Sequence, residues 1–321
     1  MGLYPVLGNP PASMGFVGFI RFNISGLNQL IRANSCDVAL SQAIDAPDVI
    51  DGRYDRTIYS LQPFEVGGSV EFPAIYGTGA SCASPAGILL GFTTYRTPVG
   101  KLIDFDIDVK YSGQASTDFA YPDCIVDTWS FTGTQSEQTT CNVGLIGTKR
   151  DPSALTIDSD ETPVTRSINW NDLFINIEVP SIDGGIIQGQ YVRSFTVEIN
   201  NNAIRIYTLN NSLYPQDISP TKRDITGSIV FMGRQAVVSQ RALENVTRCS
   251  ENSTIQFGYS ISSPGCCGDL NVTFPNIVFQ IEEIALTNDL LETTVNWRSL
   301  PDSQDQLWDG FTSGVPLPSE S

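Results

Sequence analysis

The stretch Gly68-Ser69-Val70-Glu71-Phe72 returns 159 residues later as Gly227-Ser228-Ile229-Val230-Phe231. Two further stretches recur in the same order. Phe119-Ala120-Tyr121-Pro122-Asp123-Cys124-Ile125-Val126 returns 153 residues later as Val272-Thr273-Phe274-Pro275-Asn276-Ile277-Val278-Phe279. Glu137-Gln138-Thr139-Thr140-Cys141-Asn142 returns as Glu292-Thr293-Thr294-Val295-Asn296, with the Thr pair 154 residues later. Matches in one order and at nearly one spacing indicate that the chain contains two copies of a structural unit.

These matches divide the chain into two related domains. We predict a first domain with an N-terminal arm over residues 1–150, a linker over 151–163, a second domain over 164–300 and a C-terminal arm over 301–321. The linker combines acidic residues with two prolines, a composition typical of segments between folded units. The C-terminal arm is rich in Pro, Ser and acids, so we expect it to order only against a neighbouring molecule.

Short segments of alternating apolar and polar residues, separated by Gly, Pro, Asn and Asp, fill both domains. This pattern is typical of strands in sandwiches or barrels. We predict strands over residues 15–24, 69–75, 102–111, 124–132, 173–179, 195–209, 226–232, 254–260, 272–283 and 292–298. Helical periodicity is scarce, and the best helix candidate covers residues 239–247. The sequence therefore predicts an all-β protein with at most one short helix in each domain.

Charge and hydropathy exclude several classes of function. The 321-residue chain has 41% hydrophobic residues and carries 18 basic against 35 acidic side chains, a formal net charge of -17. Such a surface repels phosphate backbones, so we do not expect the protein to read or wrap nucleic acid. The N-terminus has no cationic segment, and no apolar run approaches the length of a membrane span. We therefore expect synthesis in a cytoplasm and no membrane insertion.

The chain contains no His, which removes the Ser/His and Cys/His nucleophile arrangements. Paired carboxylates, as in glycoside hydrolases, are the remaining catalytic possibility. The four Trp, however, fall mostly in strand-like sequence and do not mark a sugar cleft. The seven Cys form no CxxC pair, so buried reduced thiols are one interpretation and a disulfide is the alternative. We predict no enzymatic activity, no cofactor and no metal.

The segment Asp104-Phe105-Asp106-Ile107-Asp108-Val109 alternates strictly. On a strand, Asp104, Asp106 and Asp108 would share one face and the three apolar residues the other. One interpretation is an ordinary solvated face of an amphipathic strand. The alternative is a wall that faces an aqueous channel, where like charge prevents a polyanion from adhering. The second domain has no matching acidic stripe, so there we consider Glu198 or Glu282 as channel-facing acids.

At this point the sequence resembles the tail tube proteins of long-tailed bacteriophages. The resemblance lies in the order of three stretches, an N-terminal strand (Gly15-Phe16-Val17-Gly18-Phe19-Ile20-Arg21-Phe22), a long loop (Asp48-Val49-Ile50-Asp51-Gly52-Arg53-Tyr54-Asp55-Arg56-Thr57) and a strand (Val66-Gly67-Gly68-Ser69-Val70-Glu71-Phe72-Pro73). The segments Phe274-Pro275-Asn276-Ile277-Val278-Phe279 and Glu292-Thr293-Thr294-Val295-Asn296-Trp297 are similar to the closing strands of that family.

This resemblance implies two tandem β-barrel or sandwich domains of tail-tube type, in a structural virion protein. Family members assemble into hexameric rings, and two-domain members into trimers that mimic hexamers. The implied partners are the protein itself, the terminator, tape measure and baseplate or tip proteins, and double-stranded DNA in transient passage. The resemblance also implies that loops contact adjacent subunits or rings. By position these loops are residues 41–57, with Asp48, Asp51, Arg53 and Arg56, and residues 207–224, with Tyr214, Pro215, Lys222 and Arg223.

Two other classes of protein remain open. One is another phage structural protein, a tail terminator or a capsid decoration protein, with the same β architecture but without stacked rings. The other is a surface-exposed β-sandwich binding module or adhesin.

Overall fold

The computed structural model describes residues 18–24, 30–45, 60–76, 84–97, 99–111, 119–151, 167–179, 186–188, 191–209, 212–233, 253–259, 270–280, 283–286 and 291–300. This part of the chain is mostly β, as predicted, and contains one α-helix. The predicted helix at 239–247, linker residues 152–163, loop residues 46–57 and both arms lie outside the described residues.

The elements fall into two halves. The first half contributes β1 (Gly18–Asn23), β2 (Leu30–Arg32), β3 (Ser35–Cys36), β4 (Ala39–Asp45), β5 (Ser60–Pro73), α1 (Pro85–Thr94), β6 (Phe105–Tyr111), β7 (Phe119–Thr134) and β8 (Thr140–Gly147). The second half contributes the 3-10 helix η2 (Trp170–Asp172), β9 (Leu173–Glu178), β10 (Ile186–Gln188), β11 (Val192–Asn200), β12 (Ile204–Ile206), β13 (Asp217–Ser219), β14 (Asp224–Met232), β15 (Ser253–Tyr259), β16 (Leu270–Phe279), β17 (Glu283–Leu286) and β18 (Leu291–Ser299).

Each predicted strand overlaps an observed strand, but β2, β3, β4, β8, β10 and β13 were not predicted. The segment predicted as one strand over 195–209 divides into β11, which ends at Asn200, and β12, because the chain turns at Asn202, which has a φ of 48°. The segment predicted over 272–283 divides into β16 and β17. Residues 41–45, predicted as part of a loop, belong to β4.

The two halves have the same strand order. In the first half the order is β2-β1-β6-β7-β8-β5, with β3 and β4 beyond β5. In the second half it is β10-β9-β15-β16-β18-β14, with β11 beyond β14. All of these pairings are antiparallel. Each strand of the first half from β1 to β8 therefore has a counterpart at the same place in the second.

Strand register tests the three sequence matches one by one. Phe72 pairs with Cys141 and Phe231 pairs with Thr293, so these pairs occupy equivalent places. Likewise Val126 pairs with Leu145 and Phe279 pairs with Trp297, in agreement with the second match. The third match is out of register by two residues, because Thr293 is equivalent to Cys141 and not to Thr139. The sequence match aligned Thr139 with Thr293, but the strand pairing shows that these two residues are not equivalent.

The repeated glycines have a common physical reason. A Cβ on Gly68 would lie 2.6 Å from the carbonyl oxygen of Asp37, and its φ of +146° also disfavours an L side chain. A Cβ on Gly227 would overlap the carbonyl oxygen of Thr196. In both halves, therefore, the strand beside the repeated stretch approaches too closely for any residue but glycine.

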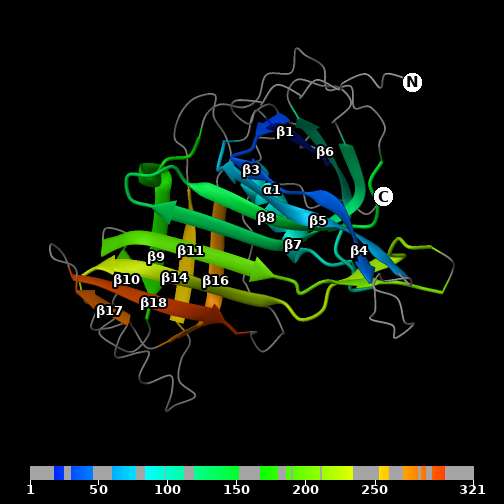
Figure 1. Cartoon of the computed structure of the whole chain (residues 1–321). Helices are drawn as coiled ribbons and strands as arrows, with labels where there is room; N and C mark the ends of the chain where they lie inside the picture. Colours follow the sequence, from blue (N-terminus) through cyan, green and yellow to red (C-terminus); the bar gives the residue numbers. More distant parts are fainter. Residues whose placement is uncertain are drawn as a thin grey trace, which may run out of the picture.

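The halves join edge to edge through β7 and β11, which pair from Ser194↔Thr134 to Asn200↔Thr128. In Figure 1, β5, β8, β7, β11, β14 and β18 accordingly run side by side through the molecule. One apolar core extends through both halves, and Phe131 of β7 contacts Phe195 and Phe257 of the second half. Among the described strands this sheet does not close into a barrel.

The helix α1 was not predicted, and its burial explains why. All ten of its residues are buried, so it has no polar face and no helical periodicity of hydrophobic residues. Its remaining sequence signal is the Ser84-Pro85 start, where the Ser84 hydroxyl accepts from the Gly87 amide at 3.1 Å. The Trp129 indole of β7 donates to the Ala86 carbonyl at 3.1 Å and fixes the helix on the sheet.

Candidate functional site

The three aspartates of the β6 stripe have different surroundings. Asp104 and Asp106 are exposed, and Asp106 accepts a hydrogen bond from the Asp123 amide at 3.2 Å. Asp108 is only 2% exposed. Its carboxylate accepts from the Arg21 guanidinium at 2.9 Å and from the Asn23 side-chain amide at 2.9 Å. The alternation is as predicted for the apolar residues, but Asp108 is enclosed and its charge is compensated.

The β1–β6 layer lies over the β5–β8 layer. Phe22 of β1 contacts Phe72 of β5, with ring centroids 6.2 Å apart. The apolar faces of the two layers therefore meet in the core, and their outer faces point in opposite directions. The acids of β6 lie on the outer face of the first layer.

The outer face of the other layer continues through both halves, and we call it the polar face. Burial alternates along its strands, so that every second residue points away from the core. The members are mostly hydroxyl and amide side chains of β5, β7, β8, β11, β14 and β18: Ser69, Glu71, Thr128, Ser130, Thr132, Thr140, Asn142, Thr196, Glu198, Asn200, Thr226, Ser228, Thr294, Asn296 and Arg298.

Glu198 lies in a continuous row across this face. It pairs in register with Ser130 on one side and Thr226 on the other, and the row extends to Glu71 and Arg298. The Thr132 and Thr196 hydroxyls lie 3.5 Å apart across the β7–β11 junction. The sequence therefore identified one member of this row, but not the row itself.

Charge on the polar face is sparse. Among the members named above, Arg298 is the one cation, and it forms an ion pair with Asp224 at 2.7 Å. Glu198 is exposed and Glu71 is partly exposed. The polar face thus consists mainly of neutral hydrogen-bonding groups, with isolated carboxylates and with Arg298, whose charge is compensated by Asp224.

The second predicted contact loop, residues 207–224, is anchored on β5. The Phe64 amide donates to the Leu213 carbonyl at 2.8 Å, and the Tyr207 hydroxyl donates to the Phe64 carbonyl at 2.9 Å. The Tyr214 ring stacks on Phe64 with centroids 4.7 Å apart, and Pro215 is buried. Tyr214 and Pro215 therefore hold the loop to its own chain.

Exposed apolar side chains gather on and beside the β12–β13 hairpin. Leu209 is fully exposed, and Ile204 is 55% exposed. Further large apolar side chains with substantial exposure are Leu61, Ile206, Tyr207 and Leu213. We call this group the hairpin patch. Contiguous exposed apolar patches of this kind often mark interaction surfaces.

Arg223 is partly buried, in contrast to the exposed Lys222 beside it. Its guanidinium donates to the Thr94 carbonyl at 2.7 Å and to the Asn201 side-chain oxygen at 3.0 Å. Burial, with a smaller contribution from Arg96, lowers the pKa of Arg223 to about 10. Arg223 and Asn201 of the second half therefore satisfy the carbonyls at the C-terminus of α1 in the first half.

Residues of the acidic stripe and of the second predicted contact loop line the same cleft, of about 580 Å³, between the halves. Asp104 of the acidic stripe lines it together with Tyr214 and Pro215 of the contact loop. Lys101 crosses the cleft to form an ion pair with Asp217 at 2.5 Å, and this contact lowers the pKa of the Asp217 carboxyl. The charges of this cleft are thus largely paired.

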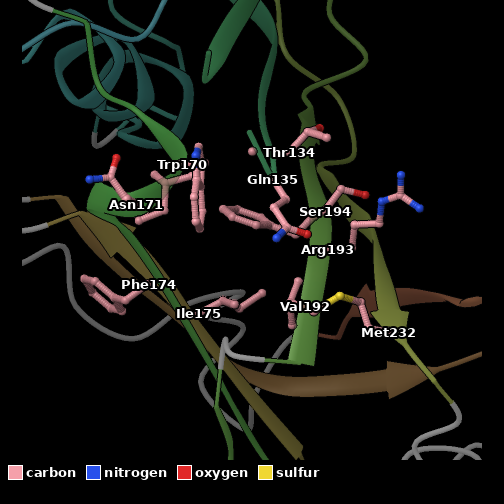
Figure 2. Close-up of a pocket in the computed structure, with 13 residues that line it drawn as sticks. Thr134, Gln135, Trp170, Asn171, Phe174, Ile175, Val192, Arg193, Ser194 and Met232 are labelled. Atoms are coloured by element: carbon pink, nitrogen blue, oxygen red, sulfur yellow. The ribbon is translucent and has the colours of Figure 1, made fainter. Parts of the chain in front are cut away.

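Figure 2 shows a second cleft, of about 310 Å³, at one end of the β7–β11 junction. Trp170, Phe174, Val192 and Met232 form its apolar lining, and Arg193 is the one charged residue among those that line it. Arg193 is already engaged with Glu292 in an ion pair. This cleft has no pair of carboxylates for general acid and base catalysis.

Among the described residues we find neither a reactive cysteine nor a metal-binding group. Cys36, Cys124 and Cys141 carry free thiols, and burial raises the pKa of each of them. No group of three or more His, Cys, Asp or Glu side chains comes together there. No helix in the described ranges has the length and apolarity needed to cross a membrane.

Several predicted site residues lie outside the described residues. These are Asp48, Asp51, Arg53 and Arg56 of the first contact loop, and Glu282. Their assignments stay predictions. The sequence analysis did not identify Arg21 or Asn201 as important residues. The only sequence feature that marks them is a polar residue within, or directly after, an apolar strand.

Comparison with protein-family models matches residues 7–263 to the family described as phage tail tube protein. A search of curated proteins returns no match. The family match ends before β16, so the similarity of the closing strands stays a resemblance. Because it covers well over half of the chain, the chain belongs to the phage tail tube protein family.

Proposed function

We propose that this chain is the major tube subunit of a phage tail, and that it polymerises into stacked rings whose bore is lined by the polar face. Family membership supports the tail tube role. The observation that carries the lining is the continuous passage of the polar face across the β7–β11 junction. Three chains in each ring would present six related halves, a pseudo-hexamer.

The chemistry of the polar face suits a channel for DNA. Neutral hydroxyl and amide groups carry no positive charge that would hold phosphate, and the charge of Arg298 is compensated by Asp224. Two like charges about 10 Å apart in water repel by about 0.4 kcal/mol. Salt screens this repulsion over roughly 8 Å, so Glu71 and Glu198 act only on a duplex that approaches the wall. The genome can then pass without adhering.

This proposal gives the acids of β6 a different place from the one their alternation suggests. They lie on the outer face opposite to the polar face, so both sets cannot line one bore. Of the described acids that the sequence analysis considered as channel-facing, Glu198 is the one that this proposal places in the bore. Asp104 and Asp106 belong to the outer surface of the tube, and Asp108 stabilises the subunit.

Contacts along the tube are assigned to the loops. The hairpin patch exposes apolar area that a monomeric protein would normally cover. We therefore assign it to the contact between rings, together with residues 46–57 and the C-terminal arm. Terminator, tape measure and baseplate or tip proteins are the proposed partners at the tube ends. The protein is a structural component of the virion, assembled in the host cytoplasm, and not an enzyme.

Electron microscopy of the purified chain tests the assembly. We expect filaments with a central channel and six density lobes in each ring. Single closed rings would favour a terminator, and monomers at high concentration would contradict the proposal.

Thiol labelling in assembled tubes tests the lining. We expect a cysteine introduced by Glu198→Cys to react with a small maleimide but not with a maleimide on a large polymer, because the polymer cannot enter the bore. Asp106→Cys is the matched control on the opposite face and should react with both reagents. The chain has seven cysteines of its own, so the labelling of the unmodified chain is subtracted before the two variants are compared. Equal polymer labelling at both sites would overturn the lining.

A further inference from the structure

The joint between the halves provides a model for a joint between chains. In β7–β11, Glu198 pairs with Ser130, Val197 with Phe131 and Phe195 with Gly133. The Asn201 amide donates to the Asp127 carbonyl and the Gln135 amide donates to the Arg193 carbonyl, both at 2.8 Å. Odd-numbered residues of β11 therefore turn their backbone groups toward β7.

Strands β3 and β4 occupy the place of β11 in the first half. Cys36 pairs with Val70 at the place equivalent to the Phe195–Ile229 pair, and Ala39 pairs with Gly67 at the place equivalent to the Glu198–Thr226 pair. Residues 35–41 thus align with residues 194–200. The aligned side chains follow the same alternation, with Val38 and Val197 both 1% exposed.

The two aligned strands differ at their outer edges. The outer edge of β11 is covered by β7, and Phe195 and Ile199 are 5% and 0% exposed. Within the described residues, β3 and β4 pair with β5 alone. The residues equivalent to Phe195 and Ile199 are Cys36 and Leu40, and both are only partly buried. In the part of the chain that the structure describes, no strand covers the outer edge of β3–β4 as β7 covers that of β11.

In the second half, β16 and then β17 take the place of the long strand β7, and among the described strands the outer edge of β17 has no partner. Phe131 pairs with Cys141, and Ile284 of β17 pairs with Thr293, the equivalent of Cys141. Ser130 and Glu283 are equivalent in the same way. Among the described strands, β17 pairs with β18 alone. In Figure 1, β17 and β4 lie at opposite ends of the molecule, as a head-to-tail joint requires.

We propose that β17 of one chain pairs antiparallel with β3–β4 of the next copy of this chain, in the register of β7 and β11. The register places Glu283 opposite Ala39 of the next copy, Ile284 opposite its Val38 and Leu286 opposite its Cys36. The proposal rests on the proposed self-assembly into rings and specifies its contact. A head-to-tail joint of this kind generates a closed ring or a helical filament, and it pairs two strand edges of each chain that have no neighbour among the described strands.

One polar group of the β3–β4 edge has a partner within the chain. The Tyr121 hydroxyl donates to the Val38 carbonyl at 3.1 Å. In the second half, Phe274 takes the place of Tyr121, and the equivalent Val197 pairs with Phe131. The Tyr121 hydroxyl thus bonds a carbonyl on the edge that has no neighbouring strand among the described residues. Because a carbonyl oxygen accepts two hydrogen bonds, Val38 can still pair with an added strand.

Disulfide cross-linking tests this register. Glu198 and Ser130 form a non-hydrogen-bonded pair, in which Cα atoms lie about 4.5 Å apart and a disulfide fits. We expect Ala39→Cys with Glu283→Cys to link chains on oxidation and to give a ladder of multimers without reductant. Asp37→Cys with Ala285→Cys is a second variant at the next such pair. Ser130→Cys with Glu198→Cys should close within one chain and shows that the geometry is competent.

A shifted pair provides the matched control. Ser41→Cys with Ala285→Cys uses the same strands and the same face, but the register separates these positions by about 13 Å, four residues of strand. We expect no ladder from it. Intermolecular bonds in the shifted pair, or their absence in both in-register variants, overturns the joint. Tubes without the cross-link leave the proposed function standing and reject this joint, whereas a cross-link without tubes supports the joint and rejects the tube.

Discussion

The first and second halves solve the same structural problem with different chemistry. In the first half, Asp108 lies between Arg21 of β1 and Ala120 of β7, and its carboxylate holds the Arg21 guanidinium. In the second half the equivalent residue is Gln256, between Asn176 of β9 and Thr273 of β16.

The second half uses neutral amides where the first uses charges. The Gln256 side chain donates to the Asn271 side-chain oxygen at 2.9 Å and accepts from the Asn176 side chain at 3.4 Å. The fold therefore needs a satisfied polar cluster at this place, but it does not need a charge. Asp108 is part of that cluster, which is why its place in an acidic stripe does not make it a channel residue.

The largest expected effect comes from breaking the charged cluster. Asp108→Ala removes the carboxylate that pairs with the Arg21 guanidinium, which is 15% exposed. We expect a loss of about 3 kcal/mol in the free energy of unfolding. Gln256→Ala, the matched change in the second half, should cost about 1–2 kcal/mol because it removes neutral hydrogen bonds. Denaturant unfolding of both variants measures the difference, and equal losses would contradict the comparison.

Substitutions of the repeated glycines, Gly68 and Gly227, compare the two halves at places where a neighbouring backbone comes very close. Gly68→Ala and Gly227→Ala should each lower the free energy of unfolding by about 2–3 kcal/mol, because the added methyl group meets a neighbouring backbone. Gly68 should be the more sensitive site, since its φ of +146° adds backbone strain. The control is Gly91→Ala in α1, where nothing lies within 4 Å of the added carbon. It should be neutral or stabilise by up to about 1 kcal/mol.

Exchanging the clusters should have a smaller effect than breaking one. The double change Arg21→Asn with Asp108→Gln copies the amide pair of the second half into the first. We expect a change of less than about 1.5 kcal/mol, because no buried charge remains unpaired. A double-mutant cycle with the two single variants measures the coupling. If the double variant is as unstable as Asp108→Ala, charge at this place is essential after all.

The smallest effect is expected for the ion pair that joins the halves at the surface. Lys101 and Asp217 are 51% and 39% exposed, so Lys101→Met should cost less than about 1 kcal/mol. Lys101 lowers the pKa of Asp217 in the folded state. The stabilisation is therefore present above the ordinary aspartate pKa and is lost as the pH falls through the lowered value. Unfolding curves of the two proteins should differ near neutral pH and converge in acid; a difference that grows in acid would contradict this.

Strands were the most predictable part of the fold. Alternation with period two is a local property, and it identified β6, β14, β15 and β18 nearly at their observed bounds. Strand β8 was missed, although its burial alternates strictly. Its small residues Gly144 and Gly147 lower the apparent strand propensity of the sequence. The helix α1 was missed because a helix that is buried all round has no amphipathic signal.

The candidate site was less predictable than the fold. Alternation correctly separated the apolar side chains of β6 from Asp104 and Asp106, but it could not show that Arg21 encloses Asp108. The polar face was also out of reach, although Glu198 belongs to it. Its rows are defined by the register between strands as distant in sequence as β5 and β14, and register is not a local property.

By itself, the sequence determined the all-β character, the repeated stretches and the acidic charge of this protein. These follow from composition and from the spacing of residues along one strand, which act locally. Only the tertiary structure decided which outer face is continuous across the halves, which aspartate is enclosed and which strand edges lack a neighbour. Such properties arise from the pairing of segments far apart in the chain, because the side chains and backbone groups around each residue are supplied by other strands.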